Sequence, residues 1–295
     1  MMIEVTPIRP SARRFVFSQL SDGIKFLDDR TALAALFVTL FFLNYAGNFI
    51  DALTNLSAVD NDLTHSRTIT GAEVFGFFAI AVVLKDLNRD RVLRWWDFVA
   101  IIGVTIASIY PSPLSRAIAM TGLGFLLGAR SDKRLASLGQ LCIGLVWIDF
   151  WGALVLSLIG PWLLPIESKF AYLAVSPFGA FSLDGLIISN GNGFAIKIIE
   201  PCSAFHNTIT TAFIWLSLIR IQRLEFHLKY FSVLAMGLAI VVLLNTARIG
   251  VMAVSKNEYL FWHMGSGLWI VKFVMLGAVL GLFYFGLRPP QTRTA

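Results

Sequence analysis

The sequence predicts an all-α membrane protein that crosses the bilayer about eight times and carries one small β-hairpin-like loop outside the membrane. Hydrophobic residues make up 57% of the 295 residues and charged residues only 14%, whereas soluble domains carry about 25% charged residues. A bilayer core about 30 Å thick needs about 20 apolar residues per helix. Eight segments approach that length: 31–50, 69–84, 98–110, 114–129, 138–160, 203–219, 230–252 and 266–287.

These segments divide the chain into five parts. Residues 1–30 form a cytoplasmic segment, 31–160 a bundle of the first five helices, and 161–201 an extracytoplasmic loop; residues 202–288 hold the last three helices and 289–295 a cytoplasmic tail. The first 30 residues lack the apolar core of a cleavable signal peptide. We therefore expect the first helix to remain as an anchor.

The stretch 98–129 is open to two interpretations, a hairpin of two short helices or one long helix broken at Pro111 and Pro113. The distribution of basic residues along the chain decides between these two interpretations. In the hairpin interpretation, the clusters of basic residues at 85–94, 130–134 and 220–229 fall on the same side as both termini, which the positive-inside rule assigns to the cytoplasm. A single helix would instead place Cys202 in the cytoplasm.

The formal net charge of +6 does not indicate a nucleic-acid partner, because the basic residues form short clusters at helix ends. No Gly-rich phosphate loop or dinucleotide fingerprint occurs, so we expect no cofactor. Cys142 is predicted near the cytoplasmic end of the fifth helix and Cys202 at the outer end of the sixth, so the two cysteines should lie on opposite faces of the membrane and remain unpaired.

The loop before the sixth helix contains two short apolar runs, 185–189 and 194–199, on either side of a turn-rich Asn-Gly-Asn-Gly tetrapeptide. This pattern favours a hairpin, and a solvated loop is the alternative. The hairpin would lead the chain into Glu200, Pro201 and Cys202. Since proline suits the first turn of a helix, we expect the sixth helix to begin there with Cys202 in its first turn or at its cap.

Cys202 is a candidate nucleophile because a helix N-terminus favours the thiolate form. The polar residues Glu200, Ser203 and His206 surround it in the sequence. The alternative is a small apolar residue that fills a gap between helices. That interpretation suits Cys142 better than Cys202.

Two more candidates are predicted to reach the same face of the membrane. Arg248 lies near the outer end of the seventh helix, about 27 Å from its cytoplasmic boundary, and Asn245 shares its helical face. A membrane arginine has a partner or a water-filled cavity, or it snorkels to the headgroups. His263 precedes the last helix, where it could transfer a proton or serve as an interfacial belt residue.

His206 leaves the choice of base open, because four residues after Cys202 it would share the face of the thiol on one helix. A metal site formed by Cys202, His206 and His263 is a further alternative, although a Cys-x3-His pair with one distant histidine is weak evidence for it.

The order Glu-Pro-Cys-Ser-Ala at 200–204, Asn-Thr-Ala-Arg-Ile at 245–249 and then His263 resembles the exosortase/archaeosortase family of membrane transpeptidases over about residues 180–280. The resemblance implies a cysteine-type peptidase or transpeptidase with Cys202, Arg248 and His263 as catalytic residues. Family members commonly have glycine after Cys-Ser, where this chain has Ala204. Auxiliary candidates are His206, Asn245, Glu200 and Ser203.

The resemblance also implies a substrate class and a location. Such enzymes process exported proteins whose C-terminal tail combines a short recognition motif, a hydrophobic helix and a basic end. The active site would face outward from the cytoplasmic (inner) membrane, where a thioester on the cysteine would be resolved by water or by an acceptor amine of unknown identity. The bilayer and the tailed proteins are the expected partners.

Two other classes compete with this interpretation. Asp149, Glu73 and Lys272 lie within predicted helices, as ionisable residues of a proton-coupled transporter would. Against a transporter, we find no internal repeat and no pair of matching broken helices. A non-catalytic membrane assembly protein is the third class. Replacing Cys202 would abolish the output of an enzyme and need not affect the other two.

Overall fold

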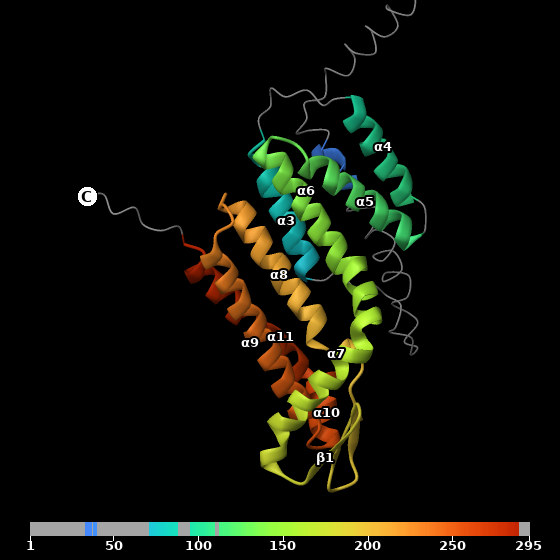
Figure 1. Cartoon of the computed structure of the whole chain (residues 1–295), viewed down its shortest axis with the longest axis vertical. Coiled ribbons are helices and arrows are strands. Elements are labelled where there is room, and N and C mark those ends of the chain that lie inside the picture. Colours follow the sequence, from blue (N-terminus) through green and yellow to red (C-terminus); the bar gives the residue numbers. More distant parts are fainter. Residues whose placement is uncertain (1–32, 37, 40–70, 88–94, 110–111, 289–295) are drawn as a thin grey trace, which may run out of the picture. The chain divides into compact units, whose positions relative to one another are not determined.

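The computed structural model describes residues 33–36, 38–39, 71–87, 95–109 and 112–288, which are mostly helical with one small sheet (Figure 1). The chain forms two compact units. One comprises Met1–Thr68 and Leu84–Pro111, and the other comprises Ile69–Val83 and Ser112–Ala295. Every candidate site residue belongs to the second unit.

In the first unit, helix α4 (Trp95–Ile109) occupies the predicted segment 98–110. Residues 33–36 and 38–39 are helical, and the rest of the predicted helix at 31–50 lies outside the described residues. Helix α3 (Gly71–Lys85) corresponds to the predicted segment 69–84 and continues from the second unit into the first. All three predicted segments therefore contain helix wherever the structure describes them.

The second unit continues with helices α5 (Pro113–Gly128) and α6 (Lys133–Val146). Helix α5 starts as a helix of its own, because the Ser112 side chain caps it and Pro113 occupies its first position. Helices α5 and α6 approach so closely that a methyl group on Gly139 would collide with the Gly124 carbonyl.

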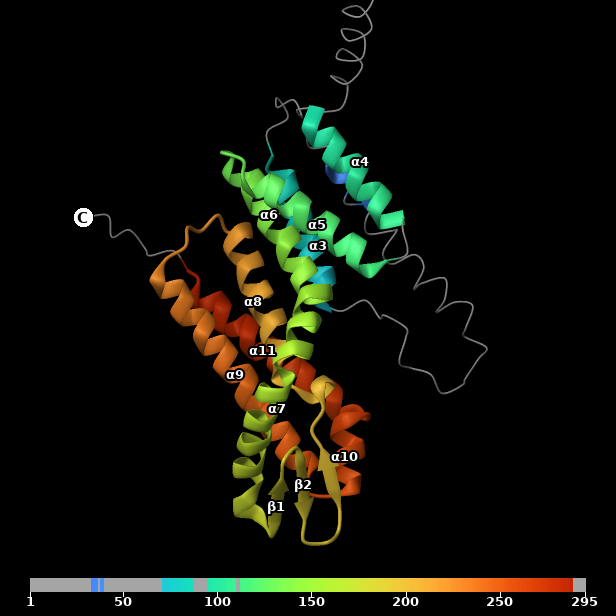
Figure 2. The ribbon, with the colours of Figure 1, turned by 45° about the vertical axis from the view of Figure 1, so that its right-hand side comes forward.

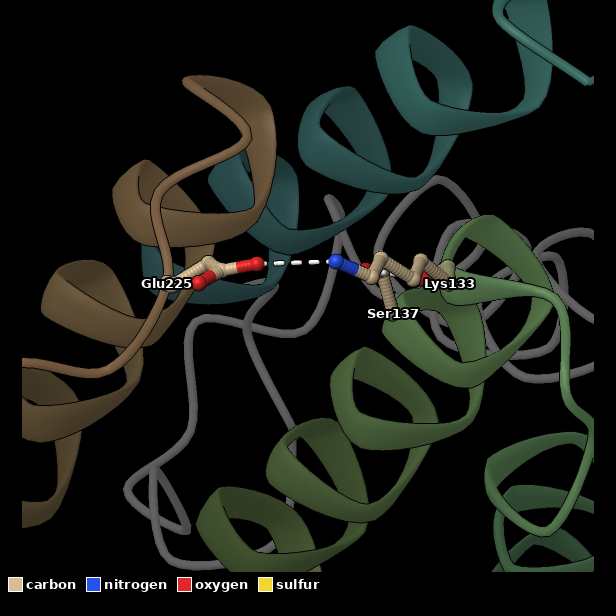
Figure 3. A network of polar contacts seen from close by, with 3 residues as sticks. All are labelled: Lys133, Ser137 and Glu225. Atoms are coloured by element: carbon tan, nitrogen blue, oxygen red, sulfur yellow. Dashed lines mark hydrogen bonds and ion pairs between the residues drawn. The ribbon is translucent and has the colours of Figure 1, made fainter.

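The start of α6 also pairs with the loop that follows α8. Lys133 Nζ lies 2.8 Å from Glu225 Oε1, and the Ser137 hydroxyl donates to the Lys133 carbonyl. Figure 3 shows the three residues together. Both charged side chains are more than 80% exposed, at 87% and 81%. Solvent screens an ion pair this exposed, and such pairs contribute little to stability, so it does not explain the fold.

A single continuous helical stretch of 46 residues runs from Lys133 to Phe178. It comprises α6, the π-helical turn η2 (Trp147–Trp151), α7 (Gly152–Val175) and the 3-10 turn η3 (Ser176–Phe178). Residues 161–178 were expected to start the extracytoplasmic loop, and that expectation is wrong. Pro161 and Pro165 indicate a helix end, yet they lie inside α7 because the residues after them still bury one helical face.

At about 1.5 Å per residue this stretch is about 69 Å long, more than twice the thickness of a bilayer core. It also changes direction within α7 (Figures 1 and 2), as helices containing proline commonly do. The predicted span 138–160 is one part of it. The remainder of α7 packs against the sheet.

The sheet has three antiparallel strands in the order β1 (Phe181–Asp184), β2 (Ile187–Asn190) and β3 (Ala195–Lys197). The predicted hairpin is confirmed in β2 and β3, whose turn has Gly193 at φ +81°. Strand β1 was missed, because Ser182 and Asp184 alternate with only two apolar residues. Apolar side chains on one face, including Ile188 and Ile196, pack against α7 and α9.

Helices α8 (Ala204–Ile221), α9 (Leu228–Met252) and α11 (Ser266–Gly286) agree with the last three predicted segments. Helix α10 (Lys256–His263) was not predicted. The 46-residue stretch, α9 and α11 are the described helices that are long and apolar enough to cross a membrane. The protein is therefore associated with a membrane, while the number of eight spans stays a prediction.

Two apolar clusters lie along α9. The bundle cluster joins α8, α9 and α11, and its buried members are Ile214, Trp215, Ile219, Tyr230, Val233, Val241, Val279, Phe283 and Leu287. The sheet-end cluster joins α7, the sheet, α9 and the turn before α8, and its buried members are Leu164, Ala171, Val175, Ile188, Ile196, Ile198, Cys202, Ile249, Met252 and Ala253.

Candidate active site

Cys202 lies in a short 3-10 turn, Glu200–Cys202, between the sheet and α8. Its backbone N–H donates to Ile199 O at 2.8 Å, and the Ser203 N–H donates to Glu200 O at 3.0 Å. Helix α8 begins only at Ala204, because Ser203 has extended backbone angles and caps the helix. The expectation that Cys202 lies in the first turn of that helix or at its cap is therefore wrong, since Ser203 is the cap.

Asn245 on α9 holds this turn in place. Its side-chain Nδ2 donates to the Cys202 carbonyl oxygen at 2.8 Å, and the residue is only 1% exposed. The sequence placed Asn245 on the face of Arg248 but gave no partner for it. A buried amide bonded to the backbone of Cys202 fixes the position of the thiol relative to α9.

His263 is the imidazole that approaches the thiol. Its Nε2 lies 3.9 Å from Cys202 Sγ. Helix α10 ends at His263, and the ring stacks on Tyr259 one turn earlier, with ring centroids 4.8 Å apart at an angle of 13°. Burial, and then the positive charge of Arg248, lower the pKa of His263 below its ordinary value. The neutral imidazole is thus favoured, which is the form that accepts a proton.

Arg248 completes the group. Its Nε donates to the Trp262 carbonyl oxygen at 3.0 Å, which ties α9 to α10 directly before His263. The guanidinium interacts electrostatically with both Cys202 and His263. Trp262 is held in turn by its Nε1, which donates to Glu258 Oε2 at 2.9 Å. The structure therefore brings together the three residues that the sequence singled out.

Glu167 on α7 is a site residue that the sequence analysis missed. Its Oε1 accepts hydrogen bonds from Ser203 Oγ at 2.9 Å and from the Ala204 N–H at 3.1 Å. The segment around it was assigned to a loop, so no helical face was considered. The spacing of Leu164, Ala171 and Val175 is the signal that could have revealed a helix here.

The other auxiliary candidates do not contact the thiol. His206 was expected to share a helical face with Cys202, which is wrong because Cys202 precedes the helix. The His206 side chain is exposed and interacts electrostatically with Glu73 and Lys272. Glu200 is exposed, and its carboxylate extends toward Gly160 on α7.

The arrangement around Cys202 does not indicate a metal centre. Within the described residues, no three His, Cys, Asp or Glu side chains lie close enough together to hold a metal ion. The alternative of a Cys202, His206 and His263 metal site therefore finds no support in the geometry. Both Cys142 and Cys202 are free thiols, as predicted.

Three polar atoms around the turn are buried without a hydrogen-bond partner among the described residues: Glu167 Oε2, Asn245 Oδ1 and His263 Nδ1. Buried polar groups are nearly always paired, and leaving one unpaired costs about 1–3 kcal/mol. Such groups are commonly retained for function. Here they surround the one thiol that has polar neighbours.

An apolar groove of about 240 Å³ has Arg248 in its lining. Helices α9, α10 and α11 line it, with the residues Leu244, Ala247, Arg248, Val251, Trp262, Ile270, Val271 and Val274. The guanidinium is therefore shared between the thiol site and a surface suited to aliphatic groups.

Comparison with known proteins finds no matching family model, no curated protein and no solved structure that resembles the chain significantly. The arguments for a function therefore rest on the residues of the site itself.

Proposed function

We propose that the protein is a membrane cysteine peptidase or transpeptidase, similar to the exosortase/archaeosortase family, that cleaves C-terminal sorting tails of exported proteins. The observation that carries the proposal is the 3.9 Å separation between Cys202 Sγ and His263 Nε2, with Arg248 in electrostatic contact with both. A thiol, a neutral imidazole and a fixed positive charge are the parts that acyl transfer through a thioester requires.

In the first half of the reaction, the Cys202 thiol gives its proton to His263 Nε2 and its sulfur bonds to the scissile carbonyl carbon. The carbonyl oxygen becomes an oxyanion, which the positive charge of Arg248 stabilises. The C–N bond then breaks as His263 protonates the leaving amine. The products are a thioester on Cys202 and a released tail with a free amino group.

In the second half, water or an acceptor amine attacks the thioester carbonyl and gives a proton to His263. The C–S bond breaks and the sulfur recovers that proton, so the enzyme returns to its starting state. The lowered pKa of His263 supports this cycle, because the base must be neutral before each attack.

The groove at Arg248 supports the choice of a tailed substrate. Its lining is aliphatic except for Arg248 and Trp262, and it runs between α9 and α11, two of the helices that can cross a membrane. The hydrophobic helix of a tail would lie against this groove, with the scissile bond above it at Cys202. Eight spans, cytoplasmic termini and an extracytoplasmic site in the inner membrane complete the proposal.

Strand β3 offers an edge for the recognition motif. Its hydrogen bonds to β2 use alternate residues, shown by Asn190 N to Phe194 O at 2.8 Å and Ile198 N to Leu186 O at 2.9 Å. The backbone groups of Ala195 and Lys197 therefore point away from β2, and within the described residues no strand pairs with that edge. An extended peptide added there would continue toward Cys202, five residues after Lys197.

The test compares the C-terminal peptides of exported proteins, by mass spectrometry, in cells with the wild-type protein and with Cys202→Ala. Exported proteins that end in a hydrophobic tail should lose it only in the wild type. Cys142→Ala is the matched control and should process as the wild type does. Identical tails in the wild type and in Cys202→Ala would refute the proposal and favour a carrier or an assembly protein.

A further inference from the structure

We infer that Glu167 is a positioning residue, which holds the Cys202 turn against α7 so that the sulfur faces His263. The inference concerns the same site and rests on the proposed function for its effect on catalysis. Glu167 Oε1 accepts from Ser203 Oγ at 2.9 Å and from the Ala204 N–H at 3.1 Å. It thus bonds the two residues that directly follow the nucleophile.

The backbone N–H donors of the turn are bonded almost entirely within the turn, with the bond from Ala204 to Glu167 as the exception. Each N–H donor from Cys202 to Phe205 has an acceptor, and the four bonds are Cys202 N to Ile199 O, Ser203 N to Glu200 O, Ala204 N to Glu167 Oε1 and Phe205 N to Ser203 Oγ. Three of these acceptors lie within three residues of their donors. The Glu167 carboxylate comes from 37 residues earlier in the chain, so it alone ties the donors to another helix.

The turn is held from its opposite side by Asn245, which bonds the Cys202 carbonyl at 2.8 Å. Cys202 therefore lies between one attachment to α7 and one to α9. Both attachments come from helices that also contribute to the sheet-end cluster, through Leu164 and Ala171 on α7 and Ile249 on α9. Rigid elements position catalytic groups more accurately than loops do.

The unused oxygen of Glu167 argues that the residue does more than cap a helix. A serine already caps α8, since Ser203 Oγ accepts from Phe205 N at 3.1 Å. A carboxylate supplied by another helix, with Oε2 buried and unpartnered, lowers stability, and such a cost is explained when the residue serves a site. Glu167 would serve the site by holding the nucleophile accurately, because a displacement of about 1 Å lowers the rate of a reaction about 100-fold.

The experiment uses the full-length protein in membrane vesicles, in a Cys142→Ala background that leaves Cys202 as the single thiol. Three variants are compared, Glu167→Ala, Glu167→Gln and the control Ser168→Ala, a buried neighbour whose hydroxyl bonds only its own helix, at Leu164 O. The first readout is the rate of Cys202 alkylation by a maleimide as a function of pH. The second is the processing of hydrophobic-tailed exported proteins.

We expect Glu167→Ala to change the pH profile of alkylation and to lower processing roughly 10- to 100-fold. Glu167→Gln keeps one oxygen acceptor, so its processing rate should remain within about threefold of the wild type. Ser168→Ala should match the wild type. If Glu167→Ala does not accumulate in the membrane, Glu167→Asp replaces it, because its shorter side chain withdraws the carboxylate without removing it.

The inference is overturned if Glu167→Ala, or Glu167→Asp in its place, matches Ser168→Ala in both readouts. It is also overturned if Glu167→Gln loses as much processing activity as Glu167→Ala or Glu167→Asp. Failure of the proposed function is a separate result. In that case no variant and no wild-type protein processes tails, while the alkylation profile still reports whether Glu167 positions the thiol.

Discussion

The two apolar clusters along α9 are built from similar aliphatic residues, yet they differ in the polar groups that they contain. In the bundle cluster, the buried Trp215 donates its indole N–H to the Tyr230 carbonyl at 3.0 Å, so that polar group is satisfied within the core. Buried polar atoms without a described partner occur near both clusters: Ser217 Oγ and Arg220 Nε on α8, and Glu167 Oε2, Asn245 Oδ1 and His263 Nδ1 around the sheet-end cluster. The second group differs because it lies around a thiol, with Asn245 bonded to the Cys202 carbonyl and His263 Nε2 3.9 Å from the sulfur. The sheet-end cluster therefore adjoins a group of reactive side chains, and the bundle cluster does not.

The two cysteines show the same difference. Cys142 on α6 is 0% exposed and Cys202 is 5% exposed, so burial does not distinguish them. Their neighbours distinguish them, because His263 and Asn245 contact Cys202 and not Cys142. Position in a polar turn, rather than exposure, makes a thiol a candidate nucleophile.

The largest expected effect separates two histidines. His263→Ala should lower the processing of tailed proteins about 10²- to 10⁴-fold, because it removes the proton acceptor 3.9 Å from Cys202. The control His206→Ala, which changes an exposed imidazole on α8, should stay near the wild type. Processing measured from C-terminal peptides checks both. The reverse order of effects would make His206 the base.

The two thiols provide the second prediction. In intact cells, a membrane-impermeant maleimide should label Cys202 on the order of 100-fold faster than Cys142. The reason is that His263 can accept the proton of the Cys202 thiol, and that the proposal places Cys202 on the outer face and Cys142 near the cytoplasmic end of its helix. Single-thiol variants, Cys142→Ala and Cys202→Ala, separate the two rates. Labelling of Cys202 only in inverted vesicles would instead place the site on the cytoplasmic face.

Strand β3 provides the third prediction. Lys197→Pro should reduce processing about tenfold, the equivalent of one hydrogen bond of roughly 1.4 kcal/mol, because it removes an N–H that points away from β2. The control Lys197→Ala keeps this N–H and loses only the side chain. If the two variants process equally, the outer edge of β3 does not bind the recognition motif.

The fourth prediction concerns pH. His263 has a lowered pKa, so the neutral base persists below the ordinary histidine value of about 6.5, and activity falls only as the pH drops through the lowered value. Arg248→Gln removes a charge that disfavours the imidazolium, so this acidic limb should move to higher pH. The pH profile of Cys202 alkylation measures the shift. A limb that moved to lower pH would contradict the assigned electrostatics.

The smallest effect on the chemistry is expected from the bundle cluster. Phe283→Ala, at a residue that is 0% exposed, should lower the stability of the protein by about 3–5 kcal/mol through the cavity that it creates. Thermal unfolding in detergent measures this loss. The rate of Cys202 alkylation per folded molecule should stay unchanged, and a large change would mean that the two clusters are coupled.

The secondary structure followed from the sequence where a pattern is local. Apolar runs predicted α8, α9 and α11, and the tetrapeptide at 190–193 predicted the turn between β2 and β3. The prediction failed after residue 160, where a loop was expected, because packing of the following residues keeps α7 helical past Pro161 and Pro165. Strand β1 and helix α10 are short and weakly patterned, and their contacts with the rest of the molecule stabilise them.

By itself, the sequence determined that this is a helical membrane protein, and it singled out Cys202, Arg248 and His263, because composition and unusual polar residues are visible without coordinates. The tertiary structure alone decided that His263 approaches Cys202 and His206 does not, and that Glu167 holds the turn. The contacts of His263 and Glu167 join residues 61 and 36 positions apart in the chain. Local patterns cannot specify such distances, because packing sets them.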